Sequence, residues 1–270
     1  MKIGCHVSIR EGYLGAAKRA HMLGANAFQY FPKNPRSLSV KAFDKLSATQ
    51  CAEFCNKHEM VSIAHTPYPS NPSATGEKAQ WVIDSLKNDL EIAESCGSIG
   101  IVVHFGSTSG DPLLGYQQMI RTFNEVLVDW EGEALLLIEN NAGKGDQLGT
   151  TMEELSKIRS LVERPEKVGF CLDTCHAFAS NLWDGENWDT VVKRGHELDF
   201  IGHIKAIHFN NSVYPNGSRK DRHAPIDNGE ISWESMADVL KTEALQEVPF
   251  ILETPGPHEA EIKLMNKIIQ

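Results

Sequence analysis

The chain lacks several features that mark particular classes of protein. No stretch approaches the roughly 20 consecutive apolar residues of a membrane-spanning helix, and the first residues, MKIGCHVSIREG, show no signal-peptide pattern. Only six cysteines occur among 270 residues, and they are scattered, which disfavours a small disulfide-linked secreted scaffold. These absences lead us to expect a soluble, cytoplasmic protein with reduced thiols and no membrane partner.

Linkers, composition shifts and internal sequence repeats are absent as well. A linker would separate domains, and a repeat would indicate a solenoid or an array. With 41% hydrophobic and 23% charged residues, a chain of this length can bury a full core. We therefore expect a single domain over residues 1–270, and we expect it to act as a monomer.

Short apolar runs are present, and they alternate with helix-like segments. The eight runs are residues 2–8, 26–31, 61–66, 99–105, 134–140, 168–174, 203–210 and 249–255. Between them, residues 77–97 end on Gly97, as helices often do, and residues 150–163 open with the capping-box spacing of Thr151 and Glu154. Successive run ends fall mostly about 35 residues apart, which is the length of one βα unit. Eight such units predict a (β/α)8 TIM barrel.

Barrel enzymes build their active sites at the C-terminal ends of the strands. The ends of the eight runs carry His6, Tyr30, His65, His104, Glu139, Asp173, His208 and Glu253. All but Tyr30 are ionisable side chains of metal-ligand type, and such a set would repel and desolvate itself without cations. We therefore predict a metal site there, with zinc or manganese as the ion, because these metals bind His together with Asp or Glu. His6 alone is interpreted as a structural histidine.

Two further segments add candidate ligands. His176 follows Asp173 by three residues, and the loop after the seventh run contains Asp221 and His223. If that loop is extended, Asp221 and His223 face one point, where His176 completes a compact site. Cys171 and Cys175 flank Asp173, and we interpret both as small inner-barrel packing residues, since the His and carboxylate side chains already fill the metal shells.

Several short motifs carry a family resemblance. They are GCHVS, FPKNPRS, AHTPY, VVHFGS, IENNAGKGDQLGT, CLDTCHAFAS, HFNNS, DRHAPI and LETPG. With these motifs the sequence resembles the endonuclease IV family of apurinic/apyrimidinic (AP) endonucleases, which are trinuclear-zinc (β/α)8 DNA-repair enzymes. The resemblance extends from residue 4 to residue 254, and CLDTCHAFA and IENNAG with a following LGT are its most specific parts.

The resemblance implies a ligand set for three zinc ions, with manganese as an alternative at one site. One ion is held by His65 and His104, a second by Asp173, His208 and Glu253, and a third by His176, Asp221 and His223. Glu139 bridges the first two ions.

The resemblance also implies an activity. It implies hydrolysis of the phosphodiester bond 5′ to an abasic site in duplex DNA, with Glu139 as the catalytic residue that orients the attacking water. The products are a 3′-hydroxyl and a 5′-deoxyribose phosphate, and a 3′-phosphodiesterase repair activity is expected in addition. Arg36 and Tyr68 match family residues that enter the DNA at the lesion, whereas Ser37 and Pro69 stand where bulkier residues are common.

An excess of positive charge is missing, since the formal net charge is −10. Taken alone, this charge disfavours a nucleic-acid partner. Bound zinc would offset part of it, and the field that DNA meets is local. We expect five basic side chains on loops at the barrel mouth, namely Lys33, Arg36, Arg219, Lys220 and Arg222.

Two other functions remain open at this point. A xylose-isomerase-like sugar isomerase or epimerase would hold one divalent metal with Glu139, Asp173, His208 and Glu253, and it would not require the remaining histidines. A non-catalytic metal-binding or DNA-binding module is the other alternative. It is disfavoured because so costly a polar cluster indicates open metal positions for chemistry.

Overall fold

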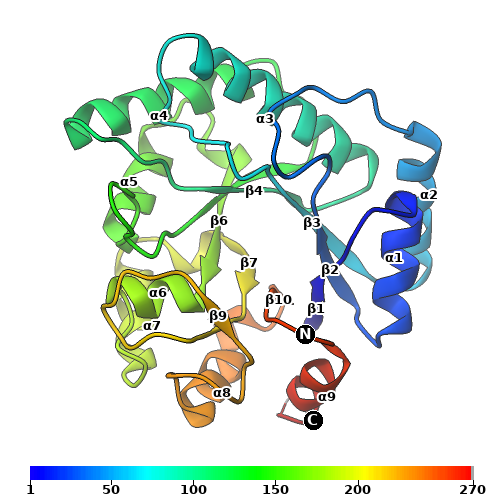
Figure 1. The fold of residues 1–270 in the computed structure, drawn as a ribbon, viewed down its shortest axis with the longest axis vertical. Coiled ribbons are helices and arrows are strands. Elements are labelled where there is room, and N and C mark those ends of the chain that lie inside the picture. Colours follow the sequence, from blue (N-terminus) through cyan, green and yellow to red (C-terminus); the bar gives the residue numbers. More distant parts are fainter. Residues whose placement is uncertain (269–270) are drawn as a thin grey trace.

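A computed structural model describes residues 1–268 and shows a closed barrel of eight parallel strands surrounded by helices (Figure 1). The strands are β1 (Lys2–His6), β2 (Ala27–Tyr30), β3 (Val61–His65), β4 (Gly100–His104), β5 (Leu135–Glu139), β6 (Val168–Asp173), β7 (Ile204–His208) and β10 (Pro249–Leu252). Neighbours in the barrel follow chain order, and β1 closes the ring by pairing with β10. Each of the eight apolar runs contains one barrel strand, so the TIM barrel prediction is confirmed.

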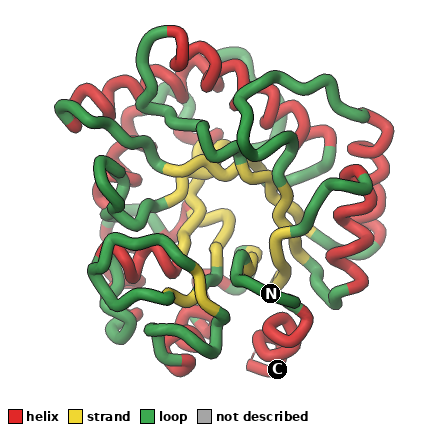
Figure 2. The backbone as a smooth tube through the Cα atoms, in the orientation of Figure 1, coloured by secondary structure: helices red, strands yellow, loops and turns green. Residues whose placement is uncertain are grey.

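The helices form an outer layer around the ring of strands, as Figure 2 shows. They are α1 (Gly12–Met22), α2 (Lys45–Lys57), α3 (Glu77–Ser95), α4 (Pro112–Leu127), α5 (Met152–Leu161), α6 (Thr174–Ser180), α7 (Trp188–Glu197), α8 (Trp233–Lys241) and α9 (Glu259–Ile268). The short 3-10 turns are η1 (Pro165–Lys167), η2 (Ile201–His203) and η3 (Glu243–Leu245). None of the helices described is long and apolar enough to cross a membrane.

Local sequence signals explain where several helices begin and end. The Thr151 hydroxyl accepts from the Glu154 backbone at 3.2 Å, and the Glu154 carboxylate accepts from the Thr151 backbone at 3.1 Å, so the predicted capping box starts α5. Helix α3 stops two residues before Gly97, whose φ of 65° lies in the left-handed region that glycine adopts at little cost.

The core has an inner and an outer layer. The inner layer fills the barrel with one small or aliphatic side chain from each strand except β1, namely Ala27, Ile63, Val102, Leu137, Cys171, Ala206 and Ile251. In β1, a side chain at Gly4 would overlap the carbonyl oxygen of Ala27, so only glycine permits this close approach of β1 to β2. The larger outer layer lies between strands and helices and includes Phe28, Phe170 and Phe250.

The six cysteines are all buried and free. Cys171 lies in the inner layer, as expected from the sequence. Although the Cys175 sulfur lies within 4.8 Å of ligand atoms of Asp173 and His223, Cys175 is not a barrel residue, because β6 ends at Asp173 and Cys175 belongs to α6. The reason is that the Asp173 carboxylate accepts a 2.7 Å hydrogen bond from the His176 backbone and caps the helix instead of allowing the strand to continue.

A small two-stranded antiparallel sheet stands apart from the barrel. It joins β8 (Asn211–Ser212) to β9 (His223–Ala224), with Ser212 opposite His223. The loop between these strands runs in front of α6, beside the open end of the barrel (Figure 1). This loop brings Asp221 and His223 to the carboxyl ends of the barrel strands.

Candidate metal centre

Nine histidine and carboxylate side chains meet where the barrel strands end. Five of them end the strands β3 to β7, Glu253 follows β10, His176 lies in α6, and Asp221 and His223 lie at or before β9. The structure brings these nine residues together, and they are the ligands predicted from the sequence. Their ligand atoms form the groups His65/His104/Glu139, Glu139/Asp173/His208/Glu253 and His176/Asp221/His223, each within 4.8 Å.

The first group surrounds one carboxylate oxygen. Glu139 Oε2 lies 3.4 Å from His65 Nε2 and 3.6 Å from His104 Nε2. Within the described residues this oxygen is buried and has no hydrogen-bond partner. A buried carboxylate oxygen without a partner is costly, so its surroundings favour a cation.

The second group shares Glu139 with the first. His208 Nδ1 lies 2.8 Å from Glu139 Oε1, 3.3 Å from Glu253 Oε2 and 3.9 Å from Asp173 Oδ2. Three carboxylates therefore converge on one imidazole in a buried place. Such a convergence of negative charge is stable only with positive charge among them.

The third group joins α6 to the β8–β9 loop. Asp221 places one carboxylate oxygen 3.3 Å from His176 Nε2 and the other 3.4 Å from His223 Nε2. His223 Nε2 also lies 3.5 Å from Asp173 Oδ2, and among the residues described here it has no hydrogen-bond partner.

These spacings fit metal ions. Most donor-to-donor distances in the first and third groups are 3.3 to 3.6 Å, which is too long for good hydrogen bonds. A tetrahedral zinc site with ligands about 2.1 Å from the ion has edges of about 3.4 Å. The donor set of imidazoles and carboxylates is also the one that zinc and manganese bind.

The lowered pKa values of two carboxylates, Glu139 and Glu253, are consistent with metal binding. Burial acts to raise the pKa of Glu139, but His104 and His208 outweigh it and hold that pKa well below its usual range. Burial is likewise outweighed at Glu253, where His208 and His223 lower the pKa to about 2. Both carboxylates are therefore charged at neutral pH and available as ligands.

The pKa values of two histidines of the centre shift upward, opposite to those of the carboxylates. Burial acts to lower the pKa of His208, yet its neighbours Cys171, Glu253 and Glu139 raise it well above the usual range. Burial raises the pKa of the Cys171 thiol to about 12, so this thiol is neutral and the carboxylates carry the effect. Nearby carboxylates also raise the pKa of His223 to about 9. In the absence of metal, protonated imidazoles thus supply the positive charge that the carboxylates require.

Backbone and amide oxygens orient the other histidines. His65 Nδ1 donates to Thr66 O at 2.8 Å, and His176 Nδ1 donates to Asn140 O at 2.9 Å. His104 Nδ1 contacts the side-chain oxygen of Asn141 at 3.1 Å. Each of these contacts turns Nε2 toward the centre, which is how proteins hold imidazole ligands in place.

Gln29 also belongs to the centre, but it was not predicted, because it is not the last residue of its apolar run. Gln29 is fully buried and contacts His208, Glu253 and His6, whereas Tyr30 points outward and bonds Ser98 through its hydroxyl at 2.9 Å. The alternation of side chains along β2 was the available signal, because it places Phe28 and Tyr30 on one face and Gln29 on the other.

A cavity of about 400 Å³ opens above the centre. Besides predicted ligands, it is lined by His6, Phe31, Tyr68, Thr254 and His258. Tyr68 stands at its rim with 67% of its surface exposed, and its ring lies 5.2 Å from that of Phe31. Arg36 does not line this cavity, but its loop is joined to that of Tyr68 by a 2.9 Å hydrogen bond from Tyr68 N to Pro35 O.

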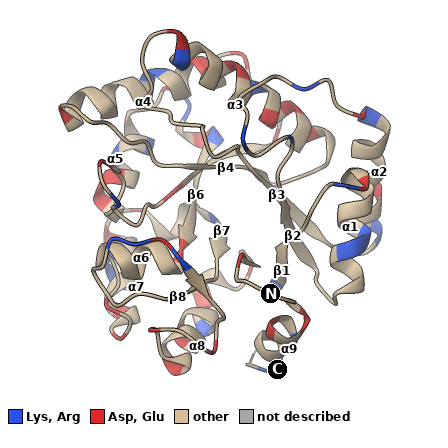
Figure 3. Cartoon of the chain, in the orientation of Figure 1, with Lys and Arg blue, Asp and Glu red and all other residues tan. Residues whose placement is uncertain are grey.

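The expected basic face needs one correction. Arg36, Arg219, Lys220 and Arg222 are exposed on loops, and the loop that leads into β9 passes in front of α6 as a largely blue segment in Figure 3. Lys33 is not on this face, because it is buried and its Nζ lies 3.1 Å from Asp89 Oδ1 of α3. The polar sequence around Lys33 does not indicate that Asp89 is its partner.

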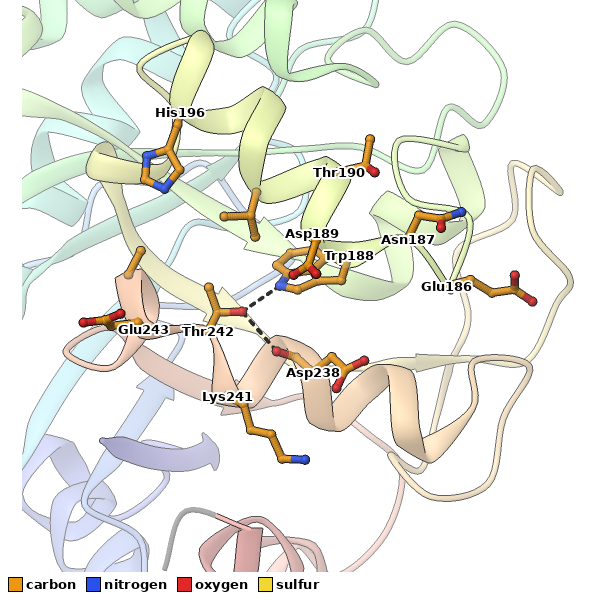
Figure 4. A pocket seen from close by; sticks show the side chains of 12 residues that line it. Glu186, Asn187, Trp188, Asp189, Thr190, His196, Asp238, Lys241, Thr242 and Glu243 are labelled. Atoms are coloured by element: carbon orange, nitrogen blue, oxygen red, sulfur yellow. Dashed lines mark hydrogen bonds between the residues drawn. The ribbon is translucent and has the colours of Figure 1, made fainter.

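A larger groove lies elsewhere on the molecule. It measures about 860 Å³ and runs between α7 and α8 on the outside of the barrel, where Trp188 Nε1 donates to Thr242 Oγ1 at 2.7 Å (Figure 4). Its acidic side chains, such as Asp189 and Asp238, do not converge on a point. The smaller cavity with its convergent ligands is therefore the candidate functional site.

The chain is similar to known proteins along its whole length. Residues 17–268 match the model of a family described as xylose isomerase-like TIM barrel. A probable endonuclease 4 of Symbiobacterium thermophilum is 42% identical over 263 residues, which are 97% of this chain and 95% of the relative. The crystal structure of endonuclease IV from Thermus thermophilus has a TM-score of 0.88 at 31% identity and covers 100% of this chain and 99% of its own.

Sugar-converting enzymes share the same fold at greater distance. A D-tagatose 3-epimerase-like protein has a TM-score of 0.71 at 19% identity and covers 100% of this chain and 97% of its own. At that identity the likeness concerns the fold alone.

Proposed function

Because the chain belongs to the endonuclease IV family, whose members are metal-dependent nucleases, we propose that it hydrolyses the phosphodiester bond 5′ to abasic sites in duplex DNA. The products are a 3′-hydroxyl and a 5′-deoxyribose phosphate, and removal of 3′ blocking groups is a second repair activity of the same site. The proposed cofactor is three zinc ions, with manganese as an alternative at one site.

The observation that carries this proposal is the third group of ligands. A sugar isomerase with one metal needs only Glu139, Asp173, His208 and Glu253. It gives no reason for His176 Nε2 and His223 Nε2 to lie 3.3 and 3.4 Å from the two oxygens of Asp221. A trinuclear phosphodiesterase requires a site of this kind.

The geometry supports the proposed residue roles. Zinc ions at the three groups would lower the pKa of water and neutralise charge on a phosphodiester. Glu139 is charged, buried and central, so it accepts a hydrogen bond from the attacking water and orients that water toward phosphorus. Its neighbours His65 and His104 lie 3.4 and 3.6 Å from the carboxylate and would hold a metal ion together with it.

DNA is proposed to bind across the open face of the barrel. Tyr68 at the rim and Arg36 on the adjoining loop enter the duplex at the lesion, while Arg219, Lys220 and Arg222 contact phosphates. An abasic nucleotide has no base to unpair, so turning it into the cavity costs less than turning a normal nucleotide. All the proposed ligands come from one chain, which supports action as a monomer.

The variant His223→Ala tests this function. Removing one of three ligands of the third group should reduce zinc from three ions per chain to two, and cleavage of a synthetic abasic duplex should fall at least about 100-fold. The measurements are elemental analysis and single-turnover cleavage. The matched control is His196→Ala, an exposed histidine on α7, which should retain three ions and full cleavage.

A different result would favour the sugar isomerase. In that case the wild type holds one metal ion, leaves the abasic duplex intact, and loses no metal when His223 is replaced. The proposed nuclease function would then be wrong.

A further inference from the structure

His208 differs from the other histidines of the centre in the nitrogen that it turns inward. His65 and His104 direct Nε2 to Glu139, and His176 directs Nε2 to Asp221 while its Nδ1 lies 3.4 Å from Glu139. His208 directs only Nδ1 to the carboxylates. Its outer nitrogen, Nε2, meets neither backbone nor water-accessible space. It meets the side-chain oxygen of Gln29 at 2.7 Å, in a part of the barrel where both residues are fully buried.

The amide of Gln29 can take only one orientation here. Its nitrogen lies 2.6 Å from Glu253 Oε1 and 3.1 Å from His6 Nδ1, so it donates one hydrogen to each. A flipped amide would set its oxygen against the Glu253 carboxylate, which repels it. The amide oxygen must therefore face His208, where it accepts from Nε2–H.

We propose that Gln29 is a positioning residue that makes Nδ1 the metal-binding nitrogen of His208 and ties His208 to Glu253. The inference deepens the proposed function, on which it rests for the presence of metal at this group. Gln29 touches no reacting atom. It acts through two ligands of one ion, which come from the end of β7 and from the residue after β10, two strands that pair with each other in the barrel.

The physical reason is the cost of an unpaired buried donor. A histidine ligand needs a partner for its other N–H, and losing such a partner weakens metal binding about 10- to 100-fold in known sites. Without Gln29, His208 Nε2–H would lose its amide acceptor in the barrel interior, where the thiol of Cys171 is only a weak hydrogen-bond partner. The imidazole would then turn or change tautomer, and Nδ1 would no longer be held toward the carboxylates.

The proposal also explains His6. This histidine ends β1 and lines the cavity, yet it belongs to none of the ligand groups. Because Gln29 Nε2 is only a donor, His6 Nδ1 must accept from it, which leaves the proton of His6 on Nε2. His6 thus completes the hydrogen bonding of Gln29 and supports its orientation.

The variant Gln29→Met tests the inference, because methionine has nearly the same length but lacks both the amide oxygen that accepts from His208 and the N–H that donates to Glu253. Tyr30→Phe is the matched control: it removes an equally buried hydrogen bond from the next residue of β2 but does not touch the centre. In Gln29→Met the affinity for one of the bound zinc ions should fall about 10- to 100-fold in competition with a chelator. The d–d absorption of the cobalt-substituted protein should change as well. Tyr30→Phe should alter neither.

A second measurement uses the wild type and so does not depend on the folding of a variant. Histidine-labelled, zinc-loaded protein should show by ¹⁵N–¹H correlation that His208 carries its proton on Nε2 and binds metal through Nδ1. Metal on Nε2 of His208 would overturn the inference. So would a folded Gln29→Met protein with wild-type zinc affinity and an unchanged cobalt spectrum.

The two proposals fail separately. Three zinc ions and cleavage of abasic DNA by the wild type, together with unaltered metal binding in Gln29→Met, would leave the function intact and remove the role of Gln29. A wild type with one ion and no cleavage would instead remove the nuclease function. The Gln29 test would still apply then, because both functions use His208 and Glu253.

Discussion

Among the single residues of the centre, Glu139 has the most constrained position. One of its carboxylate oxygens lies within 3.6 Å of His65 and His104. The other lies 2.8 Å from His208 Nδ1 and 3.4 Å from His176 Nδ1. Glu139 therefore belongs to two ligand groups at once, and we expect the loss of its charge to affect cleavage more than a change of its shape would.

Replacement of Glu139 by Gln tests that difference. The amide keeps the shape and loses the charge, so much of the metal and DNA binding should remain while cleavage falls about 100- to 1,000-fold. Single-turnover cleavage and fluorescence anisotropy with an abasic duplex at fixed salt measure the two effects. Glu247→Gln at an exposed position is the control and should behave as wild type. Cleavage near wild type in Glu139→Gln would exclude Glu139 from the mechanism.

The ligand-type residues could be predicted from the sequence because charge at the end of a buried strand needs compensation. Gln29 could not be found in that way, since an amide within the run NAFQYF suggests neither a charge nor a metal ligand. Lys33 was placed wrongly for a related reason. Its partner Asp89 lies 56 positions away in α3, and only the folded chain brings the two together. Which ion each ligand binds stays a prediction.

At the scale of elements, the loop between β2 and α2 owes its position to buried polar contacts. Lys33 reaches into the outer layer, where it pairs with Asp89 and donates to Ser85 O at 2.9 Å. Tyr13 of α1 donates to Pro32 O of the same loop at 2.9 Å. These contacts fix the loop that carries Arg36 toward the open face of the barrel.

Lys33→Met should lower the free energy of unfolding by about 3–5 kcal/mol, because it leaves Asp89 buried without its partner. The double variant Lys33→Met/Asp89→Leu should recover most of this loss. Lys263 pairs with Glu259 on the exposed face of α9, so Lys263→Met is the surface control, with a cost below about 0.5 kcal/mol. Urea unfolding measures all three, and equal losses in Lys33→Met and Lys263→Met would contradict the prediction.

The loss in Lys33→Met should depend on pH. Burial raises the pKa of Asp89 to about 7 even beside Lys33, and without Lys33 that pKa is higher still. A carboxyl group with a raised pKa binds more protons when the chain is folded, so its cost diminishes as the pH falls. The stability difference from wild type should therefore be smaller at pH 5.5 than at pH 8.

The eight barrel strands could be predicted from their apolar runs, and α5 from its capping box. The short elements could not be predicted. The run 168–174 was taken as strand to its end, but Asp173 caps α6 with its carboxylate, so the backbone turns into a helix at Thr174. The pairing of β8 with β9 joins two-residue strands that have no pattern of their own and depend on the barrel beneath them.

For the whole molecule, we expect the centre to couple metal content to stability. Removal of metal by a chelator should lower the melting temperature by at least about 10 °C. Each tightly held ion stabilises the folded chain by several kcal/mol, and each kcal/mol shifts the melting temperature of a chain this size by roughly 2–4 °C. Calorimetry of zinc-loaded and chelator-treated protein measures the change, and coinciding transitions would contradict it.

The metal-free protein should also become less stable as the pH rises from 6.5 to 9. Its carboxylates raise the pKa of His223 to about 9, so the stability that this protonated imidazole contributes is complete below pH 6.5 and is lost through pH 9. Zinc-loaded protein should show a flatter profile, because histidine ligands are already deprotonated. Parallel profiles with and without zinc would argue against these histidines as ligands.

The closure of the barrel by β1 and β10 also affects how the protein is made. Lys2 pairs with Pro249 and Cys5 with Leu252, and Glu253 follows directly. A ribosome must therefore translate the chain as far as Glu253 before the barrel can close and before the last carboxylate of the centre exists. Chains that terminate before Pro249 have neither, so the centre can be completed only in chains that have also gained the strand that closes the barrel.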